Sequence, residues 1–235
     1  MLQSLRFLKT ENQGLVELVL TTSLKVMKYK ELEKINFIKN KILNLKNLNI
    51  LELGVQKGNS TKMFLEICNK NNGKLISIDI DDCSNVAKDQ RWTFLHTSDD
   101  NFNYIDNFIK NKLDVIFIDS LHEPNHVKKV FYHYYDFLNL NGLIFIDDVS
   151  WLHYVKNSIG DNDFIERTNR LTFNKILEIY NSNKENITLD FNFQGSGLAI
   201  ISKLNNQLNK EKKIKNRLFT IKNLIKNIYS RKPKK

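Results

Sequence analysis

The chain has 235 residues, of which 41% are hydrophobic and 26% charged, with eight glycines and two prolines. This composition excludes collagen-like, low-complexity and wholly disordered chains, and the length is sufficient for one hydrophobic core. The net charge of +10 is unevenly distributed, because residues 203–235 carry 12 basic residues and a single acid. We therefore expect a nearly neutral folded body with a basic C-terminal tail.

No apolar run approaches the roughly 18 residues of a membrane span. Charged residues interrupt the first 20 positions, so neither a signal peptide nor an anchor is expected. The two cysteines, Cys68 and Cys83, form no metal-binding or redox spacing. This pattern favours a reducing compartment, which we take to be the cytoplasm.

Short apolar runs alternate with helical patterns along most of the chain. Helical spacing of apolar residues predicts one or two helices between residues 15 and 45. The next predicted strands span residues 48–54, 74–80, 92–96, 113–119 and 142–148, with helices over 60–69, 101–110 and 125–138. A polar stretch over 150–170, expected to be a mobile cover, precedes a helix over 172–181. Two strand-like runs, 188–193 and 198–202, are joined as a hairpin by Gly195 and Gly197.

This alternation is typical of βαβ units, so we expect an α/β fold with a parallel sheet covered on both faces. We divide the chain into an N-terminal helical segment (residues 1–47), a central α/β domain (48–203) and a basic amphipathic tail (204–235).

A glycine-containing turn follows the first predicted strand. Glu52, Gly54, Gly58 and Ser60 lie between that strand and the next helix, where glycine lets a ligand approach the backbone and the helix N-terminus offers free N–H groups. The spacing differs from that of phosphate loops and of dinucleotide-binding fingerprints. Asp79 ends the second strand, where a carboxylate can accept both hydroxyls of a ribose. Together these features predict a nucleoside-type ligand.

These motifs resemble those of the class I S-adenosylmethionine-dependent methyltransferases over about residues 48–203. The resemblance implies a Rossmann-like, doubly wound, mostly parallel seven-stranded sheet whose last strand is antiparallel. It also implies that the glycine-containing turn holds the methionine end of S-adenosylmethionine and that Asp79 binds its ribose. Ser98 and Asp99, just after the third strand, lie where the family contacts adenine. An ordinary polar loop is the alternative for these two residues.

Three carboxylates are predicted to meet at one edge of the sheet. Asp119 ends the fourth strand, and Asp147 and Asp148 end the fifth. Adjacent strands lie about 4.8 Å apart, and ligands bind at the carboxyl ends of such sheets. Three acids so close repel one another, and a divalent cation bound by oxygen ligands, Mg²⁺ before zinc, would relieve the repulsion. The alternative is that these are ordinary strand-end acids, one of which caps the next helix.

The three acids resemble those of the metal-dependent O-methyltransferases, whose members act on catechols, acyl-linked phenols or sugar hydroxyls. The macrocin-type, sugar-modifying branch has an Asp-Asp pair after the fifth strand, as this chain does. Its Asp-Gly-Asp-His motif after the fourth strand is replaced here by Asp119-Ser120-Leu121-His122, so its second Asp is missing. The resemblance implies a catalytic role for Asp119 through the metal. His122 lies where the catechol branch has a lysine base, so we expect it to take the acceptor's proton; a backbone-bonding role is the alternative.

We therefore expect an S-adenosylmethionine-dependent and Mg²⁺-dependent O-methyltransferase that modifies a sugar or glycan-type hydroxyl. A phenolic or catechol acceptor is one alternative, and a family member with lost or different chemistry is another. A third is a non-enzymatic adaptor that binds a membrane or nucleic acid through its tail. Trp151, His153 and Tyr154 are candidates to line the acceptor pocket, but aromatic rings suit sugars and phenols equally.

The tail has apolar residues at helical spacing among lysines, between Ile214 and Tyr229. Such a helix packs on the body or on a partner, lies on an anionic membrane surface, or binds nucleic acid. We place peripheral contact with the inner face of the membrane ahead of nucleic acid, which is not expected as a partner. The oligomeric state stays open, a homo-oligomer included.

Overall fold

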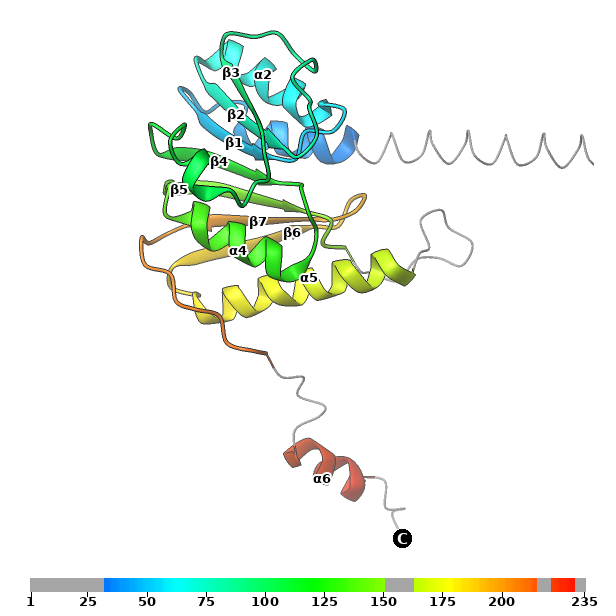
Figure 1. Ribbon diagram of the computed structural model, residues 1–235. Coiled ribbons are helices and arrows are strands. Elements are labelled where there is room, and N and C mark those ends of the chain that lie inside the picture. The colour runs from blue at the N-terminus through cyan, green and yellow to red at the C-terminus, as the bar shows by residue number, and fades with distance from the viewer. Residues whose placement is uncertain (1–31, 151–162, 215–220, 231–235) are drawn as a thin grey trace, which may run out of the picture.

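The computed structural model describes residues 32–150, 163–214 and 221–230. Its centre is a seven-stranded sheet with the order β3-β2-β1-β4-β5-β7-β6, in which β7 runs antiparallel to both of its neighbours (Figure 1). The strands are β1 (Asn49–Leu53), β2 (Lys74–Asp79), β3 (Trp92–His96), β4 (Leu113–Ile118), β5 (Leu138–Asp147), β6 (Ile187–Asn192) and β7 (Leu198–Lys203). The helices are α2 (Asn59–Asn71), α3 (Phe102–Ile105), α4 (Pro124–Tyr135), α5 (Asp163–Ser182) and α6 (Ile221–Ser230), preceded by a helical stretch over residues 32–42. The predicted Rossmann-like, mostly parallel sheet with an antiparallel last strand is confirmed.

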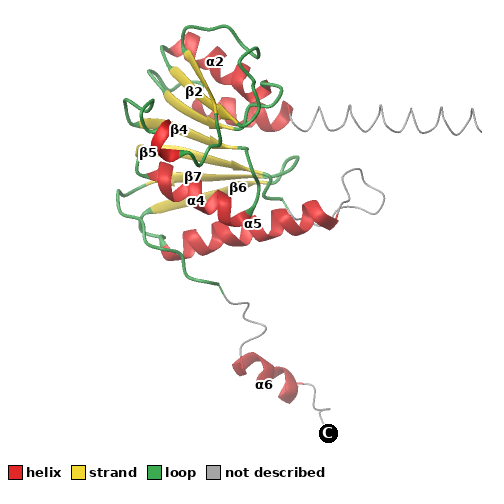
Figure 2. Ribbon diagram, viewed as in Figure 1, coloured by secondary structure: helices red, strands yellow, loops and turns green. Residues whose placement is uncertain are grey.

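Helices cover both faces of the sheet, so the side chains of each strand alternate between two cores (Figure 2). On β4, Ile116 and Ile118 pack with α4 and α5, whereas Val115 and Phe117 pack with α2 and the helix over residues 32–42. The continuous apolar runs seen in the sequence are therefore the two-sided strands of a buried sheet. Because the strands from β1 to β5 are parallel, their carboxyl ends meet at one edge, and this edge carries the site.

Some predicted elements differ from the structure. The helix expected over residues 101–110 is only the single turn α3, because the Asn and Asp residues around it are poor helix formers. β5 begins four residues early, at Leu138, and α5 begins at Asp163, so the end of the expected mobile cover is helical. The rest of that cover, residues 151–162, lies outside the described residues, as do the first 31 residues, which include the start of the expected N-terminal helices.

The tail contains a helix in the region where an amphipathic helix is predicted. α6 spans Ile221–Ser230 and overlaps the expected range of residues 214–229, of which residues 215–220 lie outside the described part. Within the described residues, every helix is too short or too polar to cross a bilayer. Cys68 and Cys83 are both buried and free.

Candidate active site

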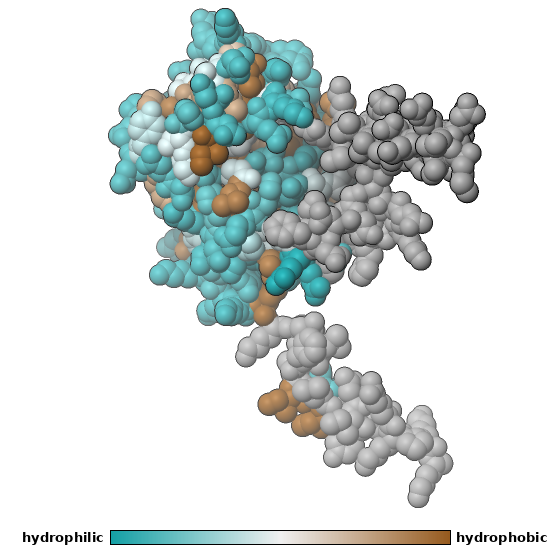
Figure 3. Space-filling model, turned by 45° about the vertical axis from the view of Figure 1, so that its right-hand side comes forward, coloured by the Kyte–Doolittle hydropathy of each residue, from teal (hydrophilic) through white to brown (hydrophobic). Residues whose placement is uncertain are grey.

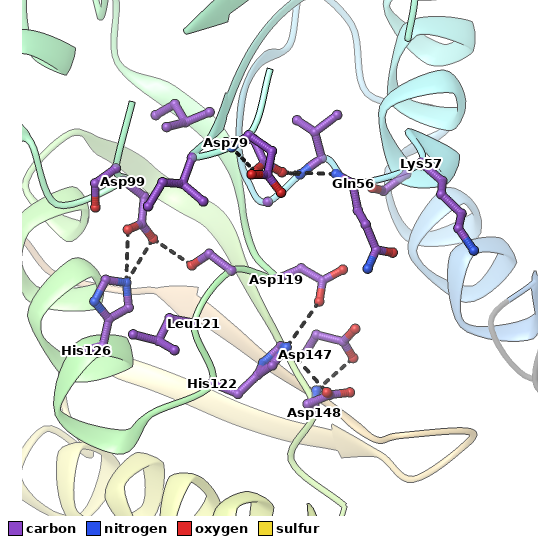
Figure 4. Close-up of a pocket in the computed structure, with 18 of the residues that line it drawn as sticks. Gln56, Lys57, Asp79, Asp99, Asp119, Leu121, His122, His126, Asp147 and Asp148 are labelled. Carbon is purple, nitrogen blue, oxygen red and sulfur yellow. Dashed lines mark hydrogen bonds and ion pairs between the residues drawn. The ribbon is translucent and has the colours of Figure 1, made fainter. Parts of the chain in front are cut away.

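A cavity of about 840 Å³ opens at the carboxyl ends of the parallel strands. Its wall joins two groups of residues: those that follow β1, β2 and β3, and those that follow β4 and β5 (Figure 4). The volume is within the range of small-molecule sites and is large enough for a nucleoside-type ligand together with part of a second molecule. The first group contains the predicted cofactor residues and the second contains the predicted acids.

The turn between β1 and α2 is shaped by backbone conformations that glycine favours. Gly54 has φ +98°, and a Cβ at this position would overlap the backbone carbonyl of Asp119. Gly58 has φ +72° and packs against Val86, away from the cavity. Gly54 and Ser60 line the cavity, whereas Gly58 shapes the turn from behind.

Asp79 ends β2 and fixes this turn from the side. Its Oδ2 atom accepts hydrogen bonds from the backbone N–H groups of Val55, at 2.7 Å, and Gln56, at 3.0 Å, and its Oδ1 atom accepts one from Asp81. Burial acts to raise the pKa of Asp79, but these backbone donors outweigh burial and hold the pKa below its ordinary value. Asp79 is therefore a carboxylate on the cavity wall, as a ribose-binding acid needs to be.

Glu52 lies underneath the turn instead of on the cavity wall. It is fully buried, and its Oε2 atom accepts hydrogen bonds from the hydroxyls of Thr61 on α2 and Ser77 on β2. Burial raises the pKa of Glu52 to about 7 against the opposing effect of these hydroxyls and of Ser60. Glu52 thus ties α2 to the sheet, and any effect on a cofactor passes through the turn.

The predicted adenine residues are partly engaged by other side chains. The Ser98 hydroxyl donates to Asp100 at 2.6 Å. The Asp99 carboxylate, only 7% exposed, accepts a 2.6 Å hydrogen bond from Ser120 and lies 3.0 Å from Nε2 of His126. Both residues line the cavity, and Asp99 connects its two halves because Ser120 follows β4.

The three predicted acids do come together at the far end of the cavity (Figure 4). Asp119 follows β4, while Asp147 ends β5 and Asp148 follows it with φ +56°. Burial and the neighbouring Asp147 raise the pKa of Asp119 well above its ordinary value, and the same two causes raise the pKa of Asp148. The cluster is therefore short of positive charge, which is the electrostatic condition of a cation site.

Lys34 supplies part of that charge from outside the sheet. Its Nζ atom donates to Oδ2 of Asp147 and, at 3.1 Å, to the hydroxyl of Ser196. Burial acts to lower the pKa of Lys34, but Asp147, Asp119 and Asp148 outweigh burial and raise it, so the side chain is an ammonium ion. The sequence does not predict that Lys34 and Ser196 contact the acids.

His122 completes this end of the cavity. Its Nε2 atom lies 3.3 Å from Oδ2 of Asp148 and 3.8 Å from Oδ1 of Asp119. The backbone carbonyl of His122 accepts a 2.8 Å hydrogen bond from Thr172 on α5, which fixes the loop after β4. The imidazole therefore faces the acids, where a proton acceptor for a bound hydroxyl is expected. The predicted pocket-lining residues after Asp148 (Trp151, His153 and Tyr154) lie outside the described residues.

The donor chemistry at this end suits a hard cation, because three carboxylates supply only oxygen ligands. In the arrangement described for residues 32–150, 163–214 and 221–230, however, no three His, Cys, Asp or Glu side chains converge closely enough to hold a metal ion. Both oxygens of Asp147 are instead engaged by the protein, since Lys34 donates to Oδ2 while Ser196 and the backbone N–H of Asp148 donate to Oδ1.

Comparison with known proteins agrees with the fold. Residues 51–149 match a family model described as a methyltransferase domain. This match runs from β1 to just after β5 and includes every predicted cofactor-binding and acidic residue. No curated protein sequence matches the chain.

Three solved structures illustrate the fold. A protein described as a caffeoyl-CoA O-methyltransferase from Staphylococcus aureus has 22% identity and a TM-score of 0.56 over 72% of this chain and 82% of that one. SAH-bound PaMTH1 from Podospora anserina has 13% identity and a TM-score of 0.57 over 77% and 87%. MycE, from the mycinamycin pathway and in complex with Mg and SAH, has 18% identity and a TM-score of 0.54 over 84% of this chain and 55% of its own.

Proposed function

We propose that this chain is a divalent-cation-dependent O-methyltransferase that uses S-adenosylmethionine, on the premise that residues 51–149 match a methyltransferase-domain model and that the fold is that of class I methyltransferases. Its acceptor is a sugar or glycan-type hydroxyl, and a phenolic or catechol hydroxyl is the alternative. One observation supports the proposal most strongly. A single cavity joins the ribose-type acid Asp79 to the acid cluster and His122, so a cofactor and an acceptor fit side by side.

The positions of residues on the cavity wall indicate which part of the cofactor or acceptor each would bind. Asp79 and the backbone of the β1–α2 turn hold the nucleoside and methionine portions, and Ser98 and Asp99 lie at the adenine end. When bound, S-adenosylmethionine would supply an electrophilic methyl group, and Asp119, Asp147 and Asp148 would hold a divalent cation that could lower the pKa of the acceptor hydroxyl. This orientation of two reactants accounts for much of the rate, because a sulfonium is already a strong methyl donor.

His122 takes the proton that the acceptor hydroxyl loses. Its Nε2 atom is within 4 Å of two of the acids, so a hydroxyl held between those acids and the methyl donor lies within reach of the imidazole. Asp119 and Asp148 orient the ring, and Thr172 fixes its backbone. Transfer of the methyl group to the acceptor oxygen would break its bond to sulfur, and the proton from the acceptor would be held on His122.

The acceptor class is inferred from two features. The Asp-Asp pair at the end of β5 matches the sugar-modifying branch of the metal-dependent enzymes, and MycE, from the mycinamycin biosynthetic pathway, is among the structural neighbours. Beside the acids, Ser120 and His122 place polar groups on the cavity wall on either side of the apolar Leu121, so this end offers hydrogen-bond partners to a ligand with hydroxyl groups. Methyl transfer to a nucleotide sugar is therefore the first reaction to assay.

Calorimetric titration tests the proposal. S-adenosylmethionine is expected to bind with micromolar affinity both with Mg²⁺ and after EDTA treatment, and Asp147→Ala is expected to retain this binding but to lose the Mg²⁺ signal and turnover. Absence of cofactor binding in either condition would contradict the methyltransferase assignment and favour the adaptor alternative. Cofactor binding with turnover that survives EDTA would contradict the metal dependence.

The basic tail has a separate role, which we propose to be peripheral contact with an anionic membrane at the cytoplasmic face. α6 exposes 77% of Ile221 and 48% of Ile225, with Lys222 and Lys226 next to them in the sequence (Figure 3). Exposed branched apolar side chains interleaved with lysines are typical of helices that lie in the headgroup region.

Vesicle sedimentation tests this role. The full chain is expected to sediment with phosphatidylserine-containing vesicles and not with neutral phosphatidylcholine vesicles. Replacing Ile221 and Ile225 with serine should reduce sedimentation while leaving S-adenosylmethionine binding intact. Equal sedimentation of the full chain and the double variant would contradict a membrane role for α6.

A further inference from the structure

Among the described residues, Lys34, Ser196 and the backbone N–H of Asp148 donate hydrogen bonds to Asp147. Of these three donors, Lys34 is the one that comes from a helix. It is separated from Asp147 by 113 positions in the sequence, and its side chain is only 11% exposed. Its second partner is the hydroxyl of Ser196, which itself donates to Oδ1 of Asp147 at 3.2 Å. Lys34, Ser196 and Asp147 thus form a closed triangle at the end of the cavity.

The position of Lys34 is fixed by helix packing. Ile35, Ile38 and Ile42 on the helix over residues 32–42 are buried in the core beneath the sheet, at the spacing of one helical face. Lys34 is four positions before Ile38 and therefore lies on the side of the helix that faces the sheet edge. Side chains alternate along β5, so Asp147 points to the same face as Phe145, which packs in this core. The ammonium is therefore brought to the acids by the fold itself.

A positive charge at this position also reduces the mutual repulsion of the three carboxylates. Three carboxylates lie together, and among the described residues Lys34 is the only lysine or arginine that forms an ion pair with one of them. A divalent cation bound to Asp147 Oδ2 would lie close to the Lys34 ammonium, and the two positive charges would repel each other. Lys34 and a divalent ion therefore compete for the same acids.

We propose that the Lys34 ammonium is the resident counter-ion of the acid cluster and that a divalent cation binds by exchanging with it. This inference rests on the proposed cation-dependent function. In the metal-free protein Lys34 stabilises Asp147, and in the metal-bound protein it withdraws toward the cavity, whose wall it already lines. Lys34 thereby sets the affinity for the cation and links cation binding to the position of the N-terminal helix.

Mn²⁺ binding, followed by the loss of the free-ion electron paramagnetic resonance signal, tests the exchange. Lys34→Met is expected to bind Mn²⁺ at least about tenfold more tightly than the wild type, because the competing charge is gone. Lys34→Arg keeps the charge and should stay near the wild-type affinity. Lys39→Met is the matched control, since Lys39 is on the same helix but pairs with Glu66 at the surface, and its affinity should be unchanged.

A measurement on the wild-type protein provides an independent test. Amine acylation followed by mass spectrometry should modify Lys34 slowly in the metal-free protein and at least about threefold faster when Mg²⁺ is present, whereas Lys39 should react equally in both states. Equal Mn²⁺ affinity of Lys34→Met and wild type, or unchanged acylation of Lys34, would overturn the exchange while leaving the cation site in place. Failure of every variant to bind Mn²⁺, with S-adenosylmethionine binding retained, would overturn the cation site and the exchange together.

Discussion

The carboxylate of Asp79 accepts a 3.0 Å hydrogen bond from the backbone N–H of Gln56, a residue held at φ +50°. This contact joins the end of β2 to the turn after β1. The acid proposed to bind the ribose therefore also shapes the loop that is proposed to hold the rest of the cofactor. A change at Asp79 affects both functions together.

Asp79→Ala is expected to weaken S-adenosylmethionine binding by about 10- to 100-fold or more, because a charged acceptor of several hydrogen bonds is lost. Isothermal titration calorimetry measures the effect directly. Asp82→Ala is the matched control, since Asp82 lies in the same loop, is bonded by the N–H of Ser84 and does not line the cavity. Equal affinities of the two variants would contradict the ribose-binding role of Asp79.

The burial of Glu52 is expected to make the stability of the protein depend on pH in an unusual way. Burial raises its pKa to about 7 in the folded protein, whereas the ordinary value of 4.5 applies after unfolding. Between these two values the folded state binds more protons than the unfolded state, so the contribution of Glu52 to the free energy of unfolding falls as the pH rises from 4.5 to 7. The loss amounts to roughly 3 kcal/mol when complete.

Urea denaturation at a series of pH values, compared between wild type and Glu52→Gln, isolates this contribution. Glutamine keeps the size and an acceptor for Thr61 and Ser77 but does not titrate in this range. The free energy of unfolding of the variant relative to wild type should therefore rise between pH 4.5 and 7 and then level off. A difference that stays constant with pH would show that Glu52 titrates normally in the folded protein.

Much of the site could be predicted because it depends on local pattern. Strand-end acids of a parallel sheet share one edge, so the approach of Asp119 and Asp147 follows from the sequence once the strands are identified. Lys34 could not be predicted in this way. Several lysines lie on that helix, and only the packing of its apolar face against the sheet decides which of them reaches the acids.

Long-range polar contacts were missed for the same reason. Lys203, the last residue assigned to the central domain, looked like the start of the basic tail, yet it is 1% exposed and donates to the carbonyls of Tyr135 and Leu138. Burial accordingly lowers its pKa. His126, on α4, is a similar case, because the fold places its ring against Asp99. Such pairings depend on which surfaces meet, and no local pattern encodes that.

Replacement of Gly54 by alanine is expected to reduce both stability and cofactor binding. Alanine at φ +98° is strained, and its Cβ would overlap the carbonyl of Asp119, so β1 and β4 would have to separate at their carboxyl ends. Gly54→Ala should lower the free energy of unfolding by at least about 2 kcal/mol and weaken S-adenosylmethionine binding. Chemical denaturation and calorimetry measure the two effects. A stable variant with normal cofactor affinity would contradict the close approach of these strands.

His122 provides the most specific test of the chemistry. His122→Gln should reduce kcat by about 100- to 10,000-fold, because the proton acceptor is lost while the shape of the site is kept. Affinity for S-adenosylmethionine should not change. His133→Gln is the matched control, since His133 bonds Asp106 at 2.9 Å and does not line the cavity, and its kcat should stay near that of the wild type. Lysine at position 122 should restore part of the rate at alkaline pH, where it becomes a neutral base. If His122→Gln retains the wild-type kcat in single-turnover measurements, the acceptor proton leaves by another route, and His122 only positions Asp119 and Asp148.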